Sequence, residues 1–270
     1  MNDLKTLYLN LIKKSLTCAL YEGMDGTVWS PRSSWQRLLL KTCVPSEIRL
    51  LQPVKLAARN EGKDWPSMAQ TMVGFKRLDN LQFCVESVLA NHVVGDLIET
   101  GVWRGGSTIF MRAILKAHGI TDRCVWVADS FQGLPHPDAV KYPTDMDDPH
   151  HQFVNLEVSL EQVQANFQRY DLLDGQVHFL KGWFKDTLPT APIKKLAIIR
   201  LDGDMYESTM DGLVNLYPKL SPGGFLIVDD YGALPACKKA VHDYREQHGI
   251  SEKICAIDWT GVYWQRSVVL

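Results

Sequence analysis

The sequence predicts an α/β fold built on a mostly parallel sheet of seven strands, preceded by a helical N-terminal arm. Short apolar runs alternate with longer segments whose apolar residues recur at helical spacing, as in strands joined by crossover helices. Several strand patterns end in glycine or acidic residues, which is typical of ligand sites at the carboxyl edge of a parallel sheet. With 270 residues, 46% of them hydrophobic, the chain is long enough for one sizeable core.

Composition narrows the class of partner. The 29 basic and 31 acidic side chains give a net charge of -2, which provides no global field for nucleic acid or a membrane surface. The six cysteines are scattered without a C-x-x-C pair, which favours reduced thiols and argues against a disulfide framework or a zinc site. No run approaches the roughly 20 apolar residues of a membrane helix. We therefore expect a cytoplasmic protein with a small-molecule partner.

Residues 1–66 differ in residue pattern from the rest of the chain. Residues 1–20 have apolar positions at helical spacing, but two lysines interrupt them before a signal-peptide core could form, so an amphipathic helix is predicted. Residues 21–66 mix tryptophan and proline with polar residues, which indicates short helices and loops. We therefore expect a helical arm and lid over residues 1–66 and the main domain over residues 67–270, within one globular unit. The apolar first helix favours a homodimer or a larger homo-oligomer.

The main domain begins with a helical pattern over residues 72–89. Five strand patterns follow, at residues 96–100, 125–129, 177–180, 196–201 and 225–229. Helical segments are expected at residues 107–118, 160–170, 208–217 and 235–248. The last two strands, at residues 254–257 and 262–265, flank the turn Trp259-Thr260-Gly261. Five βα units closed by such a hairpin are typical of the Rossmann-like class I methyltransferases rather than of a plain dinucleotide-binding fold.

A glycine-containing loop follows the first of these sheet strands. It reads Glu99-Thr100-Gly101-Val102-Trp103-Arg104-Gly105-Gly106-Ser107, and glycine lets a backbone turn tightly and approach a ligand. The spacing is neither G-x-G-x-x-G nor that of a P-loop, which argues against nicotinamide dinucleotides and nucleoside triphosphates. S-adenosylmethionine fits better, because it has no phosphate group.

Two further strand ends support this cofactor. Asp129 ends the second strand, where a carboxylate can accept hydrogen bonds from ribose hydroxyls, although a helix cap or a turn is the alternative role. The aromatic pair Trp183-Phe184 follows the third strand and could cover an adenine ring or fill the core.

Three acids indicate a metal site. Asp202 and the pair Asp229-Asp230 end adjacent strand patterns 27 positions apart, the length of one crossover. Three carboxylates suit Mg²⁺, which could also hold two neighbouring substrate hydroxyls, acidify one and align it with a sulfonium methyl group. The alternative is that these acids cap helices or turns. Asp204 and Glu207 could substitute for a ligand or support one.

The Pro-interrupted stretch 134–151 carries several histidine and aspartate residues. Such a polar stretch beside a predicted site is more often a mobile lid than a metal site, so we expect it to gate the substrate.

Taken together, these motifs resemble the macrocin O-methyltransferase (TylF-type) family, which includes the mycinamicin and novobiocin sugar O-methyltransferases of antibiotic biosynthesis. The resemblance covers roughly residues 60–266, and its motifs lie at 64–67, 71–80, 96–106, 125–133, 199–211 and 223–231. It implies an O-methyltransferase that depends on S-adenosylmethionine and Mg²⁺ and acts on a sugar hydroxyl of a glycosylated natural product, usually as a homodimer or larger assembly.

The resemblance also implies residue roles. Asp202, Asp229 and Asp230 would bind the metal, and Asp202 would also be the catalytic base. The residues expected around the cofactor are Thr71, Met72, Glu99, Thr100, Gly101, Val102, Trp103, Ser107, Asp129, Ser130, Phe131, Gln132, Gly133, Gly182 and Trp183.

Three other functions remain open at this point. Catechol-type methyltransferases share the metal plan but place a lysine three positions after the first aspartate, where this chain has Met205, so a phenolic acceptor is less favoured. A metal-dependent phosphoester hydrolase could use the same acids, but the glycine loop argues against it. A non-catalytic cofactor-binding partner would need the acids only as caps. Residues 1–60 carry no recognised motif, and the sugar, hydroxyl and scaffold are not specified.

Overall fold

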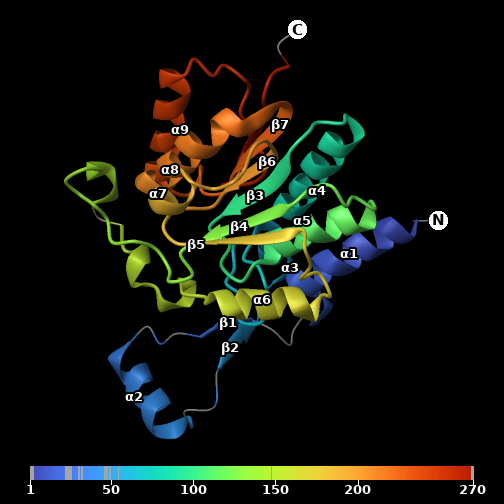
Figure 1. Ribbon diagram of the computed structural model, residues 1–270. Helices are drawn as coiled ribbons and strands as arrows, with labels where there is room; N and C mark the ends of the chain where they lie inside the picture. Colours follow the sequence, from blue (N-terminus) through green and yellow to red (C-terminus); the bar gives the residue numbers. More distant parts are fainter. Residues whose placement is uncertain are drawn as a thin grey trace.

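The computed structural model describes residues 3–21, 26–29, 31, 33–45, 48, 50–53, 55–146 and 148–268. Figure 1 shows a central twisted sheet with helices on both faces. Its seven strands are ordered β5-β4-β3-β6-β7-β9-β8. Their bounds are β3 Asp96–Thr100, β4 Val125–Asp129, β5 Val177–Lys181, β6 Leu196–Leu201, β7 Leu220–Val228, β8 Cys255–Ala256 and β9 Val262–Gln265.

The strand directions confirm the predicted sheet. The pairs β3–β4, β4–β5, β3–β6 and β6–β7 are parallel, whereas β9 is antiparallel to both β7 and β8. The chain moves outward from β3 through β4 to β5 and then returns to β6 on the other side of β3. Ligands bind at such a reversal, outside the carboxyl ends of the strands. The predicted cofactor loop and acids all follow strands at this edge.

One strand begins earlier than predicted. The segment Leu220–Gly224 contains a proline and two glycines, which predict a turn, but in the structure it forms the first half of β7. The pairing shifts register here, because Leu196 is opposite Leu220 and Ile198 is opposite Phe225. The irregular pairing accommodates the turn-forming residues inside the strand.

Successive strand residues serve two apolar cores, since their side chains point to opposite faces of the sheet. Leu97 joins the core below α4, α5 and α6, whereas Ile98 joins the core below α8 and α9. The helices of the main domain are α4 Phe75–Ala90, α5 Gly106–Ala117, α6 Leu160–Arg169, α7 Phe184–Thr187, α8 Tyr206–Leu216 and α9 Pro235–Gln247. Single 3-10 turns are η2 Pro143–Asp145, η3 His150–Gln152, η4 Val154–Leu156 and η5 Tyr217–Lys219.

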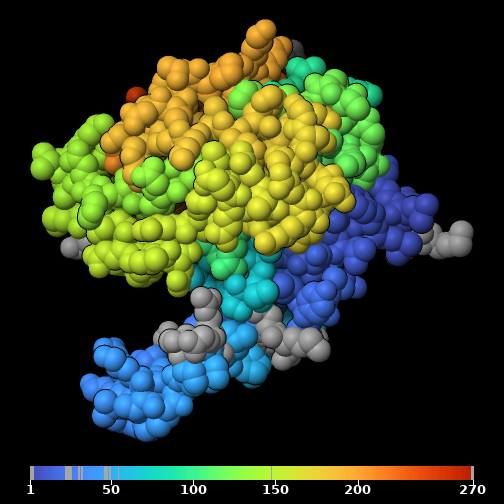
Figure 2. All heavy atoms as spheres, turned by 60° about the horizontal axis from the view of Figure 1, so that its bottom comes forward, coloured from blue at the N-terminus to red at the C-terminus, as the bar shows by residue number. Residues whose placement is uncertain are grey.

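The N-terminal arm has two parts. The predicted first helix is α1 Leu4–Leu16, which packs on α5 and buries Leu9, Ile12 and Leu16, with η1 Ala19–Tyr21 just after it. The second part contains α2 Ser34–Cys43, α3 Leu56–Glu61 and an unpredicted antiparallel pair, β1 Gly26–Val28 with β2 Leu51–Pro53. Figure 2 shows that α2 projects away from the main body. Among the described residues, none of the helices has the length and apolar character of a membrane span.

Candidate functional site

The glycine loop after β3 lies directly against the end of β6. Gly101 has a φ of +82°, and a Cβ atom there would lie 1.7 Å from the carbonyl oxygen of Asp202. The backbone N–H of Asp202 donates to the carbonyl oxygen of Thr100 over 2.9 Å. A glycine is therefore required where these two strand ends meet, and it brings the predicted cofactor loop beside the first predicted metal ligand.

The same loop fixes the segment that precedes α4. The N–H of Gly106 donates to the Gln70 carbonyl oxygen over 3.0 Å, and a Cβ atom at Gly106 would lie 2.6 Å from that oxygen. Arg104 donates to the carbonyl oxygens of Ser67 and Ala69. Because the chain is held here on its way to Thr71 and Met72, these two side chains lie over the carboxyl edge of the sheet.

A first cavity lies beside the ends of β3, β4, β5 and β6 and the start of α8. Loop 134–157 and the start of α7 form its outer wall. Of the predicted cofactor residues, Met72, Gly101, Trp103, Asp129, Ser130, Gly133 and Trp183 line it, together with Phe184 and Leu156.

Asp129 is held by the backbone around this cavity. Its Oδ2 atom accepts a hydrogen bond from the N–H of Val102 and its Oδ1 atom accepts one from the N–H of Phe131, each over 2.7 Å. Burial raises the pKa of this carboxyl, although these backbone N–H groups lower it in part. Each carboxylate oxygen has a second lone pair, so Asp129 can still accept bonds from a ligand.

A second cavity opens toward the ends of β6 and β7. The predicted residues Thr71, Met72, Glu99, Val102, Trp103, Ser107, Asp202, Asp229 and Asp230 line it. Met72, Trp103, Leu156, Asp202 and Asp204 border both cavities, so the two lie side by side. The predicted residues Thr100, Phe131, Gln132 and Gly182 line neither of these two cavities.

The three predicted metal ligands lie together in the second cavity. One carboxylate oxygen from each of Asp202, Asp229 and Asp230 lies within 4.8 Å of the others. The Asp202 side chain is 27% exposed and Asp229 is 8% exposed. The prediction that the acids come from adjacent strands is confirmed, because β6 and β7 pair directly.

The acids repel one another in this buried setting. Burial first, and then the charge of Asp229, raise the pKa of Asp202 to about 6. Burial and the charge of Asp202 raise the pKa of Asp204 to about 7, and burial with the neighbouring acids raises that of Asp230 as well. A divalent cation would favour the ionised forms, and three carboxylate oxygens form a donor set that Mg²⁺ prefers. The residues therefore fit a hard cation.

Glu99 offers a different kind of contact. One oxygen pairs with Arg200, while the other, Oε2, is buried without a hydrogen-bond partner among the described residues. Burial raises the pKa of Glu99 to about 8. Because Glu99 lines the second cavity, its open oxygen fits the ammonium group of an amino-acid ligand.

Residues 5–266, nearly the whole chain, match the macrocin O-methyltransferase (TylF) family model. The chain belongs to the macrocin O-methyltransferase family. It is therefore an S-adenosylmethionine-dependent O-methyltransferase, as the resemblance predicted. The match extends well to the N-terminal side of residue 60, where the motifs of the resemblance begin, so most of the arm belongs to the family as well.

Similar members of the family have names that state the molecules they methylate. The mycinamicin III 3''-O-methyltransferase of Micromonospora griseorubida is 59% identical over 97% of this chain and 96% of its own length. The demethyldecarbamoylnovobiocin O-methyltransferase of Streptomyces niveus is 59% identical, covering 98% of this chain and 95% of its own length. An 8-demethyl-8-(2,3-dimethoxy-alpha-L-rhamnosyl)-tetracenomycin-C 4'-O-methyltransferase of Streptomyces olivaceus is 56% identical over 98% of this chain and 94% of that protein.

Solved structures agree with this assignment. The O-methyltransferase NovP superposes with a TM-score of 0.86 at 50% identity, covering 98% of this chain and all of that one (100%). A calicheamicin methyltransferase, at 17% identity, covers 98% of this chain and 94% of its own with a TM-score of 0.58, which shows the shared fold alone.

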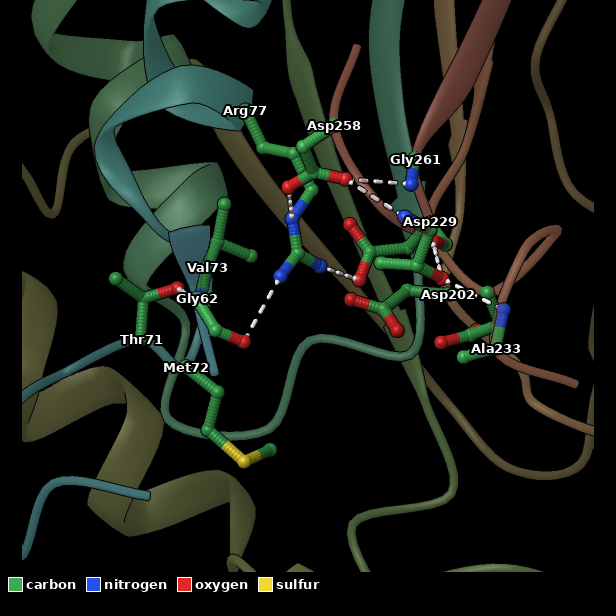
Figure 3. Close-up of polar contacts among 12 residues, drawn as sticks. Gly62, Thr71, Met72, Val73, Arg77, Asp202, Asp229, Ala233, Asp258 and Gly261 are labelled. Atoms are coloured by element: carbon green, nitrogen blue, oxygen red, sulfur yellow. Dashed lines mark hydrogen bonds and ion pairs between the residues drawn. The ribbon is translucent and has the colours of Figure 1, made fainter. Parts of the chain in front are cut away.

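Two buried arginines in this family member were not among the predicted site residues. Arg200 of β6 donates to Glu99, to Asp202 over 2.7 Å and to Asp229. Arg77 of α4 pairs with Asp229 and with Asp258 (Figure 3). The sequence context of each arginine could have indicated burial. Arg200 is the one charged residue within the apolar run 196–201, and Arg77 lies one helical turn before the core residue Leu81.

The loop over the cavities is anchored at two points. Asp145, fully buried, accepts hydrogen bonds from the backbone N–H groups of Tyr206 and Glu207 and so caps α8 from another part of the chain. Trp103 donates to the carbonyl oxygen of Asn155 over 2.8 Å. His150 lines the second cavity and pairs with Asp148, whereas Asp147 lies outside the described residues. The predicted gating role of this loop stays a prediction.

Proposed function

We propose that this protein transfers the methyl group of S-adenosylmethionine to a sugar hydroxyl of a glycosylated natural product, with the help of Mg²⁺. One observation carries the proposal: Asp202 borders both neighbouring cavities and lies beside Asp229 and Asp230. A reaction centre at this junction would have the cofactor on one side and the acceptor on the other. The names of the similar family members support a sugar acceptor on an antibiotic scaffold.

The cofactor would extend across the junction. The adenosine part suits the first cavity, where Asp129 would accept hydrogen bonds from the ribose hydroxyls and Trp183 would cover the adenine ring. The methionine part suits the second cavity, where the open oxygen of Glu99 would accept a hydrogen bond from the ammonium group. Four predicted residues do not line either cavity, and their backbone would hold the neighbouring cofactor residues in place; they are Thr100, Phe131, Gln132 and Gly182.

The acids would hold the metal and the acceptor. Asp202, Asp229 and Asp230 each present an oxygen to a common point, and Arg200 fixes two of them. Bound there, Mg²⁺ would lower the pKa of a coordinated hydroxyl of a vicinal diol and orient it toward the sulfonium methyl group. Asp202, the catalytic base in this proposal, would accept the hydroxyl proton.

A phenolic acceptor is the second candidate and has less support. The position that carries a lysine in catechol-type enzymes is Met205 here, and its side chain is fully buried. A sugar alcohol has a much higher pKa than a phenol, whose value is about 10, so it needs stronger activation by the metal and base. The acid cluster supplies that activation without a lysine.

We also propose two structural features of the assembly. The described part of the arm within residues 1–66 would act as a lid on the catalytic domain 67–270. A homodimer would bury the apolar face of α1, where Leu4 is 85% exposed and Leu7 and Leu11 are more than half exposed. Sedimentation equilibrium tests this assembly, and a purely monomeric protein at micromolar concentration would contradict it.

The acceptor and the metal can be tested together. The purified protein is given S-adenosylmethionine and one of three acceptors: a vicinal-diol glycoside, its analogue lacking one of the two hydroxyls, or a catechol. We expect methyl transfer, followed by mass spectrometry, to the diol alone, with loss of transfer in EDTA and recovery with Mg²⁺. Transfer to the deoxy analogue at an equal rate would contradict diol chelation. Full activity in EDTA would contradict the metal, and faster reaction with catechol would favour the second candidate.

A further inference from the structure

One buried side chain, Arg77, joins three separate parts of the chain. Its Nη2 atom donates to the carbonyl oxygen of Gly62, 3.3 Å away, just after α3. Its Nη1 atom pairs with Asp229, and its Nε atom lies 2.9 Å from Oδ2 of Asp258, in the turn before β9. Figure 3 shows the guanidinium between these three groups. The side chain is only 6% exposed, so these contacts are shielded from solvent.

The surroundings are shaped to admit this guanidinium. Gly62 has a φ of +60°, and a Cβ atom there would lie 2.2 Å from Nη2 of Arg77. A Cβ atom at Gly261 would lie 3.0 Å from Cδ of Arg77. Gly62 therefore needs glycine, since a Cβ atom there would also lie 2.7 Å from the backbone nitrogen of Gly74, and a side chain at Gly261 would crowd Arg77.

Arg77 also lies close in sequence to the residues over the cofactor. It is the third residue of α4, and only four residues separate it from Met72, which borders both cavities. Gly74, between them, packs on the backbone of Gly62, since a Cβ atom at Gly74 would lie 2.3 Å from the Gly62 nitrogen. A ligand that fixes Met72 would thereby fix the first turn of α4 and the base of Arg77.

We propose that Arg77 is a positioning residue that couples cofactor binding to metal binding. S-adenosylmethionine seated under Met72 orders the segment 62–77, and Arg77 then holds Asp229 in the orientation that a divalent cation requires. This inference rests on the proposed function, because it assumes both ligands.

The contact with Arg77 leaves Asp229 able to bind a cation. A carboxylate has about four lone-pair sites, and Arg77 and Arg200 each take one oxygen of Asp229 from one direction. The two arginines are also outnumbered by the carboxyl groups whose charges act on them, which are Glu99, Asp202, Asp229 and Asp258. A cation therefore still meets an excess of negative charge.

Thermodynamic linkage makes the coupling measurable from both sides. If the cofactor raises the affinity for the metal by some factor, the metal must raise the affinity for the cofactor by the same factor. We expect a factor of about five or more, the lower end of typical couplings between sites. The product S-adenosylhomocysteine serves as the probe, since it occupies the cofactor site without turnover.

The experiment is calorimetric titration of the full-length protein with Mg²⁺, with and without saturating S-adenosylhomocysteine, and the reverse titration. The test variant is Arg77→Lys, which keeps the charge but offers a compact ammonium that cannot reach three acceptors at once. A second variant, Asp258→Asn, weakens one partner of Arg77 while leaving Arg77 and the three metal ligands unchanged. The control is Arg59→Lys, because Arg59 holds the same segment through Met72 and Asp64.

The coupling factor decides the outcome. We expect it to fall to within about twofold of unity in Arg77→Lys, to fall partly in Asp258→Asn and to persist in Arg59→Lys. Equal coupling in Arg77→Lys and the unmodified protein would show that Arg77 only stabilises the fold, and equal loss in Arg59→Lys would assign the coupling to the segment rather than to Arg77. Cofactor binding with no Mg²⁺ binding in the unmodified protein would remove the metal from the proposed function and overturn this inference with it. Metal binding without coupling would overturn the inference alone.

Discussion

The two neighbouring cavities differ in what holds their walls in place. Around the first cavity, backbone groups hold the wall in place. Gly101 allows the close approach of two strands, and backbone N–H groups fix Asp129. Around the second, buried side chains carry opposite charges, with Arg77 and Arg200 distributed among the acids. We infer that the first cavity is built for a constant ligand and the second for chemistry that moves charge and protons.

The largest effect is expected where the two cavities meet. Asp202→Asn removes the proposed base and a charged metal ligand, so kcat for methyl transfer should fall by about a thousandfold, as for other lost general bases. Binding of S-adenosylhomocysteine, measured by calorimetry, should weaken by no more than about tenfold, because Asp129 and Trp183, which would hold the adenosine part, are unchanged. Retention of kcat within a factor of five would contradict the role of Asp202. Asp122→Asn, an exposed site on the domain, is the matched control.

The next effect concerns the backbone of the first cavity. Gly101→Ala should lower the free energy of unfolding by about 3 kcal/mol, since it adds a strained positive φ to a Cβ clash with the Asp202 carbonyl oxygen. Gly119→Ala is a matched control, because Gly119 has a φ of +67° but nothing lies within 4 Å of its Cβ position. The control should lose only about 1 kcal/mol, the strain of the backbone alone. Equal losses in urea denaturation would show that the close approach at Gly101 carries no cost.

The contrast between backbone contacts at the first cavity and buried charged side chains at the second also explains what the sequence could predict. Gly101 and Asp129 belong to local patterns of strand, loop and helix, and the three acids end apolar runs, so the sequence predicts the carboxyl edge of the sheet and the adjacency of the two strands that carry the acids. The partners of Arg77 lie 15, 152 and 181 positions away, at Gly62, Asp229 and Asp258, and no local pattern encodes such a contact. Likewise, β1 and β2 pair across 22 intervening residues that include α2, and a segment with a proline and two glycines enters β7 through a register shift.

A smaller effect is expected from the ribose-binding residue of the proposal. Asp129→Asn replaces one acceptor oxygen with an NH₂ group that faces a backbone N–H donor. Loss of charged hydrogen bonds should weaken S-adenosylhomocysteine binding by about 10- to 100-fold, corresponding to roughly 1.5–3 kcal/mol. The affinity for Mg²⁺ in the absence of cofactor should stay within about twofold, because the acid cluster is held by other residues. Parallel losses of both affinities would show that the cavities are not separately supported.

The smallest effect concerns the loop that covers both cavities. Asp145, in loop 134–157, caps α8, so it attaches the loop to a helix that packs on the sheet. Asp145→Asn should lower the free energy of unfolding by about 1 kcal/mol, the usual value of a helix cap. It should also raise amide exchange across the loop and KM for the acceptor, with little change in cofactor affinity. The control is Asp138→Asn in the same loop, where an exposed aspartate accepts only a local bond from Lys141. If both variants change exchange equally, the attachment to α8 is not what orders the loop, and its cover over the two cavities must depend on the contact between Trp103 and Asn155.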